Sequence, residues 1–302
     1  MSDFTSDFWS VYIGLITVVS IIACGVLLFT FSSATAGAPG ETTGHVWDED
    51  LGERNSPLPR WWMWLFFGCI IFAFIYLALY PGLGSYAGAY GWSSHGQYDA
   101  EEQQAAATYG PIFEKYLKQD IQAVAADPEA RAIGQRLFLT YCAQCHGSDA
   151  GGGRGFPNLR DGDWLYGGAP ETIKASITNG RNGMMPPLGA AIGGEEAVRD
   201  VANYVLSLSG RPHDQARAAR GKTTFDTVCA ACHTPAGTGN PAIGSPNLTD
   251  GVWLWGGSEA TIIETITNGR SNQMPAHKDK LGEGKIHLLA AYVYGLSAQA
   301  PK

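Results

Sequence analysis

The sequence predicts an all-α fold in which two transmembrane helices are followed by two tandem copies of one small helical domain. Residues 8–31 and 61–80 contain no charged side chain. Each run is long enough to cross about 30 Å of hydrocarbon as a helix that rises about 1.5 Å per residue. Farther along, residues 131–211 and 212–302, called copy 1 and copy 2 below, share one series of motifs. A series repeated only twice indicates two domains, because a solenoid needs three or more stacked units.

The first predicted transmembrane helix, residues 8–31, follows a short N-terminal segment, residues 1–7. A cleavable signal peptide is the alternative, and the small residues of Ser32–Ala38 would suit its cleavage site. The apolar stretch, however, is longer than the 7–15 residues usual in a signal peptide, and no basic residue precedes it. We therefore expect an uncleaved anchor surrounded by membrane lipid.

A Gly- and Pro-rich, acidic loop, residues 32–60, leads to the second predicted transmembrane helix, residues 61–81. We expect a solvated turn here; the alternative is a docking surface for a neighbouring membrane subunit, suggested by Trp47. The loop contains Arg54 and Arg60, whereas residues 1–7 contain no basic residue. The positive-inside rule therefore places the loop in the cytoplasm, and both termini in the periplasm outside a bacterial inner membrane.

A linker of residues 82–130 is expected to leave the membrane on the periplasmic side. Residues 82–110 are rich in Gly, Ser, Tyr and Gln, which predicts an extended segment. Pro111 then begins an amphipathic helix that reaches Ala126, because apolar residues recur at helical spacing. Asp127 and Pro128 suit the cap and first turn of the following helix.

The two copies are aligned by a Cys-x-x-Cys-His motif, Cys142–His146 in copy 1 and Cys229–His233 in copy 2, which lies 87 positions later (229 − 142). Downstream of the motif the offset becomes 89 (246 − 157), so copy 2 contains two inserted residues. The matching positions downstream are Pro157-Asn158-Leu159 with Pro246-Asn247-Leu248, Trp164 with Trp253, Arg181 with Arg270, and Met185-Pro186 with Met274-Pro275.

Cys-x-x-Cys-His is the attachment motif of c-type haem. We expect covalent bonds from Cys142 and Cys145 to one haem c and from Cys229 and Cys232 to a second. His146 and His233 would be the proximal iron ligands. Two alternatives are a zinc site and a pair of redox disulfides, but neither explains the histidines or the repeated Met-Pro units.

Met185 and Met274 are the predicted second axial ligands, because a thioether paired with an imidazole completes a six-coordinate iron. This ligand set predicts two class I cytochrome c domains. The default pairing is local, Met185 with His146 and Met274 with His233, since each copy is complete. An exchanged pairing is also open. Each copy ends in an amphipathic helix that can close a core.

Secondary contacts to the haems are also suggested by the repeat. Trp164, Trp253, Arg181 and Arg270 could meet haem propionates, because a guanidinium suits a carboxylate; core packing for the tryptophans and solvation for the arginines is the alternative. The carbonyls of Pro157 and Pro246 could accept a hydrogen bond from each ligand histidine. The histidines outside the motifs have no repeat partner, and we expect them to be exposed or capping: His45, His95, His213, His277 and His287.

The net charge of −8 argues against nucleic acid as a partner, because the chain offers no basic patch to neutralise phosphates.

The chain resembles the dihaem subunit, subunit III of the FixP/CcoP type, of cbb3-type cytochrome c oxidases. The residues that carry this resemblance are the acidic loop before Arg60-Trp61-Trp62, both haem motifs, Trp164–Gly168, Met185-Pro186 and their equivalents in copy 2. The resemblance implies that oxygen is reduced in another, catalytic subunit with a haem–copper centre, and that this chain holds no such centre.

By the same resemblance, the chain would accept electrons from a soluble cytochrome c or a bc complex and pass them on through a monohaem cytochrome c subunit. A membrane-anchored dihaem shuttle cytochrome that works alone is one alternative. A dihaem peroxidase is another, although it would need an iron with an open coordination position.

Overall fold

The computed structural model describes residues 6–32, 41–54 and 59–297. Most of residues 1–7, part of the 32–60 loop and the last five residues of copy 2 lie outside this described part. The chain divides into two compact parts, residues 1–107 and residues 108–302.

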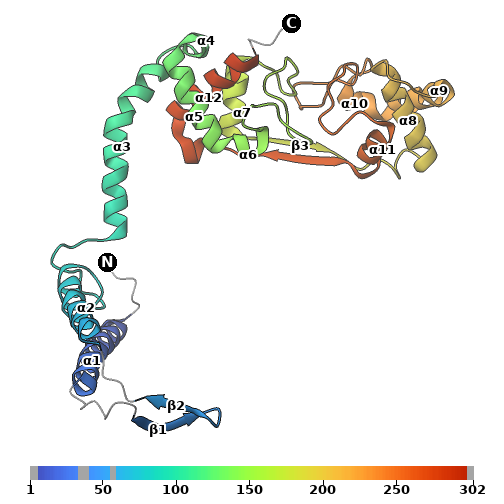
Figure 1. Cartoon of the computed structure of the whole chain (residues 1–302). Coiled ribbons are helices and arrows are strands. Elements are labelled where there is room, and N and C mark those ends of the chain that lie inside the picture. The colour runs from blue at the N-terminus through green and yellow to red at the C-terminus, as the bar shows by residue number, and fades with distance from the viewer. Residues whose placement is uncertain (1–5, 33–40, 55–58, 298–302) are drawn as a thin grey trace. The chain divides into compact units, whose positions relative to one another are not determined.

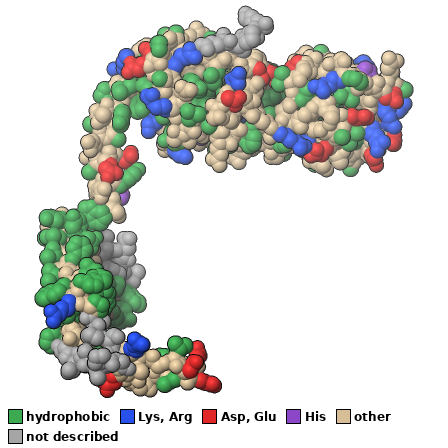
Figure 2. Space-filling model, in the orientation of Figure 1, with side chains coloured by type: hydrophobic (Ala, Val, Ile, Leu, Met, Phe, Trp, Pro, Cys, Tyr) green, Lys and Arg blue, Asp and Glu red, His purple; other side chains and the backbone are tan. Residues whose placement is uncertain are grey.

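The first part contains two long apolar helices, α1 (Asp7–Ser32) and α2 (Arg60–Leu79). Both are long and apolar enough to cross a membrane, and almost none of their side chains is buried within the protein. Figure 2 shows hydrophobic side chains covering this pair. The Ser85 amide, just beyond α2, donates a 2.7 Å hydrogen bond to the Ser10 hydroxyl near the start of α1. The two helices therefore run antiparallel, as a two-pass hairpin requires.

Two short strands between these helices differ from the all-α expectation. β1 (Thr42–Trp47) and β2 (Leu51–Arg54) form an antiparallel hairpin in the segment expected to be a solvated turn. The hairpin turns at Asp48 and Glu49, which both have positive φ. Trp47 lies opposite Leu51 on the exposed hairpin. Short polar side chains that tolerate a left-handed backbone explain the turn at Asp48.

The expected linker is more helical than its composition suggested. Helix α3 (Ser94–Leu117) begins within the stretch predicted to be extended and continues through Pro111. The Glu-, Gln- and Ala-rich residues 99–108 favour a helix, and they outweigh the Gly and Ser residues before them. Helices α4 (Ile121–Ala126) and α5 (Pro128–Tyr141) follow, and Asp127 caps α5 by accepting from the amides of Glu129 and Ala130, as predicted.

The remaining elements follow the order of the repeat: α6 (Ala143–His146), α7 (Pro170–Asn179), β3 (Arg181–Met185), α8 (Glu195–Leu208), α9 (Gln215–Thr224), the π-helical turn η1 (Phe225–Cys229), α10 (Ala230–His233), α11 (Glu259–Asn268), β4 (Arg270–Met274) and α12 (Lys278–Ser297). The described chain is thus mostly helical.

The packing of these elements does not follow the expected division at residue 211, because the two copies exchange their last helices. Helix α12, from the end of copy 2, packs against α4, α5 and α7. Helix α8, from the end of copy 1, packs instead against α9 and α11. We call the first group half A (α4, α5, α6, α7 and α12) and the second half B (α8, α9, η1, α10 and α11).

The exchange is clearest where the helices cross. Gly134 of α5 leaves space for Tyr292 of α12, and the ring centroids of Phe138 and Tyr292 lie 5.5 Å apart. In half B, Phe225 lies 5.0 Å from the ring of Tyr204 on α8. Because the equivalent helices of the two copies carry the same residues at these crossings, each last helix fits the first helix of the other copy.

A two-stranded ribbon joins the halves (Figure 1). Strands β3 and β4 pair antiparallel, with Arg181 opposite Met274 and Met185 opposite Arg270. Beyond the ribbon the His277 amide donates to the Ile177 carbonyl (3.1 Å) and the Leu188 amide donates to the Ile266 carbonyl (2.9 Å). The strands are a second departure from an all-α fold, and they carry each copy across to the other half.

Candidate haem-binding sites

In half A, the haem motif lies at the junction of α5 and α6. Cys142 caps α5, and the single turn of α6 ends at His146. The His146 Nδ1 lies 3.0 Å from the Pro157 carbonyl oxygen, so Nδ1–H donates there and Nε2 is left free to bind a metal. Burial lowers the pKa of His146, and the imidazole is therefore neutral and able to coordinate a metal.

Half B repeats this arrangement through a different backbone. The π-helical turn η1 ends at Cys229, and α10 ends at His233, which is only 8% exposed. The His233 Nδ1 lies 3.1 Å from the Pro246 carbonyl oxygen, and burial again lowers the pKa of the histidine. Both predicted proline contacts are therefore present.

The four motif cysteines form two separate pairs. Cys142 packs against the core of half A and Cys229 packs against the core of half B, so they do not form one zinc site. Burial raises the pKa of the Cys142 and Cys229 thiols to about 11. Cys145 and Cys232 are exposed. No three His, Cys, Asp or Glu side chains in the described chain cluster as a metal site.

The predicted methionine ligands lie in the exchanged halves. Met274 packs against the half A core, which also contacts Cys142 and Trp164. Met185 packs against the half B core, which also contacts Cys229 and Trp253. The default local pairing is therefore at odds with the packing, since each methionine lies with the haem motif of the other copy. Met184, given no role from the sequence, is 76% exposed.

Two glycines permit this placement of the methionines. Gly180 has φ +71°, and a Cβ there would contact the Met274 carbonyl; Gly269 has φ +71°, and a Cβ there would contact the Met185 carbonyl. Both positions require a left-handed backbone and a close approach of two backbone segments, and glycine alone meets both conditions without strain.

The predicted propionate residues surround the same two sites. Arg181 lies opposite Met274 and Arg270 lies opposite Met185 in the ribbon. In half B, the Trp253 Nε1 and the Arg270 Nη2 are buried, and neither has a hydrogen-bonding partner in the described chain. Since buried donors are normally satisfied, these two atoms fit an acceptor such as a haem propionate. The residues present therefore suit a haem.

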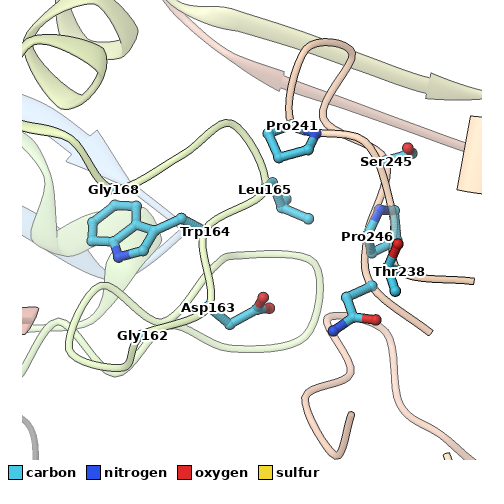
Figure 3. A pocket seen from close by; sticks show the side chains of 10 residues that line it. Gly162, Asp163, Trp164, Leu165, Gly168, Thr238, Pro241, Ser245 and Pro246 are labelled. Carbon is cyan, nitrogen blue, oxygen red and sulfur yellow. The ribbon is translucent and has the colours of Figure 1, made fainter. Parts of the chain in front are cut away.

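A cavity of about 280 Å³ separates loops of the two copies. Figure 3 shows Trp164 and Leu165 of copy 1 on one side and Pro241, Ser245 and Pro246 of copy 2 on the other. Burial and the nearby carboxylates of Asp250 and Asp161 raise the pKa of Asp163 at its edge. The loop that holds one ligand histidine thus lies close to the tryptophan of the other site.

One expectation about the remaining histidines is wrong. His287 on α12 is 4% exposed, and both its ring nitrogens are buried without a hydrogen-bonding partner among the residues that the structure describes. Its position within the apolar stripe of α12, directly after Ile286, was the sequence signal that it faces the core.

Two family models match this chain. Residues 39–87 match the N-terminal domain of cytochrome oxidase-cbb3, FixP. Residues 129–205 and 216–293 each match the model for cytochrome c oxidase, cbb3-type, subunit III. The first of these two matches includes most of α8, which packs in the other half, so the sequence repeat and the packing halves do not coincide.

Curated relatives match almost end to end. The chain is 54% identical to the cbb3-type cytochrome c oxidase subunit CcoP of Rubrivivax gelatinosus, over 98% of this chain and 97% of the relative. It is 40% identical to the CcoP subunit of Cereibacter sphaeroides, over 87% and 97% of the two chains. It is 41% identical to the FixP subunit of Azorhizobium caulinodans, over 86% and 94%. The chain therefore belongs to the CcoP/FixP family, the cytochrome c subunits III of cbb3-type cytochrome c oxidases.

Proposed function

We propose that this chain relays electrons through two covalently attached haems c to the oxygen-reducing subunit of its oxidase. One haem would be bound by Cys142 and Cys145, with His146 and Met274 as its axial ligands. The other would be bound by Cys229 and Cys232, with His233 and Met185. The observation that carries the proposal is the packing of each methionine in the half that contains the other copy's haem motif.

A haem with these ligands supplies a one-electron couple at an iron whose two axial positions are filled. The chain's own residues would fix the properties of that couple. Pro157 and Pro246 orient the imidazoles through Nδ1–H, and the apolar cores of both halves exclude water. Trp253 and Arg270 provide buried donors for a propionate, and Trp164 and Arg181 hold the corresponding places in half A.

The partners and the location follow from the family and from the anchor. The two-pass hairpin would hold residues 108–302 in the periplasm, with both termini there and the β1–β2 hairpin in the cytoplasm. Electrons would enter from a soluble cytochrome c or a bc complex and leave through a monohaem cytochrome c subunit to the catalytic haem–copper subunit. The excess of Lys and Arg in the loop between the helices supports this orientation.

The methionines provide the direct test. Met185→Ala and Met274→Ala should each convert one haem to a high-spin form that binds carbon monoxide, and Met184→Ala, at the exposed neighbour, should change neither haem. A Cys145→Ser background identifies the first haem, because the vinyl group left intact shifts its α band to longer wavelength. If Met274→Ala changes the haem of His233 instead, the exchanged pairing is wrong.

Purification separates the three functions. An electron-transfer subunit should co-purify in detergent with a haem–copper partner and support its oxygen consumption. A shuttle cytochrome should purify alone, and a peroxidase should turn over hydrogen peroxide with an open iron in the unsubstituted chain. Absence of covalent haem on a denaturing gel would exclude all three.

A further inference from the structure

Two aromatic rings at equivalent positions of the repeat reach across from one half to the other. Tyr166 of copy 1 and Trp255 of copy 2 follow the tryptophans already assigned to the haem sites. Each carries an arginine of its own copy on one face: the guanidinium carbon of Arg181 lies 4.4 Å from the Tyr166 ring centroid, and that of Arg270 lies 4.4 Å from the Trp255 ring centroid. Each ring also contacts a glycine of the opposite copy.

Trp255 contacts the loop that follows His146. A Cβ added to Gly155 would lie 2.9 Å from the six-membered ring of Trp255, and Gly155 has φ +85°. The same loop is held by copy 2 at two more points, because the Gly155 amide donates to the Leu254 carbonyl (2.8 Å) and the Asn272 side chain donates to the Gly155 carbonyl (3.1 Å). Three contacts from copy 2 therefore converge on one glycine.

Tyr166 makes the equivalent contact in the other direction. A Cβ added to Gly244 would overlap the Tyr166 phenol ring, and Gly244 has φ +72°. In the described chain the backbone of Gly244 has no counterpart of the two hydrogen bonds at Gly155, and Gly183, at the position equivalent to Asn272, has no side chain to donate one. Of the contacts that come from the opposite copy, the ring therefore matters more at Gly244 than at Gly155.

Ring size and loop length compensate each other. The turn that meets Trp255 is closed by mutual hydrogen bonds between Gly153 and Phe156, whereas the turn that meets Tyr166 is closed between Asn240 and Ser245 and contains the two inserted residues. The larger ring thus meets the shorter turn and the smaller ring meets the longer turn. Complementary sizes at both junctions indicate a fitted contact, since interiors are packed closely enough for one methylene to matter.

Both glycines lie two residues before the proline whose carbonyl accepts from a ligand histidine. We infer that Tyr166 and Trp255 are positioning residues, each of which sets the axial imidazole of the haem held by the opposite half. Trp255 would act on His146 through Gly155 and Pro157, and Tyr166 would act on His233 through Gly244 and Pro246. This inference rests on the proposed haem ligation.

The physical link is the hydrogen bond to Nδ1. Contacts behind a metal-bound histidine fix its ring orientation and its basicity, and both influence the metal. A loop that moves by a few tenths of an ångström changes the Nδ1–H···O=C contact at His146 or His233, which measures 3.0 and 3.1 Å here. The midpoint potential and the ferric g-values of that haem should then change more than those of the other haem.

The test uses the full chain in detergent with two matched substitutions, Tyr166→Leu and Trp255→Leu. Redox titration followed by visible and electron paramagnetic resonance spectra reports both haems, and Cys145→Ser or Cys232→Ser backgrounds identify each by its α band. Tyr166→Leu should shift the potential of the His233 haem more than that of the His146 haem, which the variant reaches through Arg181. Trp255→Leu should shift the potential of the His146 haem by a smaller amount, because two hydrogen bonds also hold the loop at Gly155.

Tyr166→Phe and Trp255→Phe retain a ring at each contact and should give smaller shifts of the same haems, and they allow the test if a leucine variant does not fold. A larger shift in the haem of the ring's own half, equal shifts in both haems, or no shift would overturn the inference while leaving two His/Met haems in place. Loss of His/Met ligation in the unsubstituted chain would instead contradict the proposed function.

Discussion

Halves A and B are built from the same repeat, yet they are closed in different ways. Half A is covered by residues that precede the repeat: Tyr116, at the end of α3, and Ile121 and Val124 of α4 are almost completely buried in its core. The Tyr116 hydroxyl donates a 2.9 Å hydrogen bond to Glu129 on α5. Half A is thus sealed mainly by apolar surface.

Half B has no such cover and relies on charge at the seam between α8 and α9. Asp200 accepts hydrogen bonds from Arg217 at 3.0 Å and from Arg220 at 2.7 Å, and its side chain is only 15% exposed. Glu196 also pairs with Arg217. The same helix crossing is therefore completed by burial in half A and by ion pairing in half B. The two halves should respond differently to substitution and to pH.

The largest expected effect removes the cover of half A. Tyr116→Ala leaves a cavity where a fully buried ring stood, and it should cost about 3–5 kcal/mol of unfolding free energy. Hydrogen exchange resolved by peptide should show faster exchange in α4, α5, α7 and α12 and unchanged protection in α8 and α9. Tyr116→Phe, which keeps the ring and loses the hydroxyl's bonds to Glu129 and Lys115, should cost about 1–2 kcal/mol. Equal loosening of both halves would contradict the division.

The helix crossings give the next effect. Gly221→Ala and Gly134→Ala should each cost about 1–3 kcal/mol, because added volume in a tight crossing forces the helices apart. Gly221 should be the more sensitive, since a Cβ there would come closer to the backbone carbonyl of Asp200 than a Cβ at Gly134 would come to that of Leu288 (2.8 Å). Denaturant unfolding of the haem-loaded chain measures both, and a larger loss for Gly134→Ala would reverse the order.

Asp200→Asn tests the charged seam of half B. It should lower the unfolding free energy by about 1–2 kcal/mol, because the amide makes weaker bonds to the two arginines. Arg220 foremost, with Arg217, holds the pKa of Asp200 below its ordinary value near 3.8. The contribution of the Asp200 carboxylate to the unfolding free energy is therefore complete at pH values above 3.8. It is lost as the pH falls through the lower pKa of the folded state. Acid unfolding of α8 and α9 should begin at higher pH in the variant; identical acid curves would exclude this role.

The smallest effect at neutral pH concerns His287 in half A. This residue should make the stability of half A depend on pH in a range where that of half B does not. Burial, with Lys174 adding to it, lowers the pKa of His287 from its ordinary 6.5. A base that is harder to protonate when folded stabilises the fold above 6.5, and this stability declines as the pH falls below 6.5. His287→Leu should flatten the pH dependence of half A in that window. Half B, followed by hydrogen exchange in the same samples, should keep its own curve.

Much of the candidate site could be predicted because its residues carry their chemistry in short motifs. The cysteines, the histidines, both prolines behind them and the Met-Pro units are all read from spacing within one copy. The exchange of helices could not be predicted in this way. Gly134 and Gly221, like Tyr204 and Tyr292, are equivalent residues, so either last helix satisfies either first helix and the sequence alone favours neither pairing.

The remaining differences from the prediction have the same origin in non-local contacts. The segments 181–185 and 270–274 become strands because they pair with each other, and neither has the length or the alternating apolar pattern that identifies a strand by itself. Residues 94–110 become helical because Glu, Gln and Ala outweigh the flanking Gly and Ser residues. The β1–β2 hairpin depends on a turn at Asp48 and Glu49, which an acidic run does not reveal.

The exchanged last helices set the order in which the two halves are completed as the chain is synthesised. All elements of half B have been synthesised once residue 274 is added, whereas half A is complete only after α12, the final helix. The Cys142–His146 motif, which is made first, is therefore enclosed last, because α12 completes its half only at the end of synthesis. A chain that stops short of α12 would leave that crevice open while its neighbour closes normally.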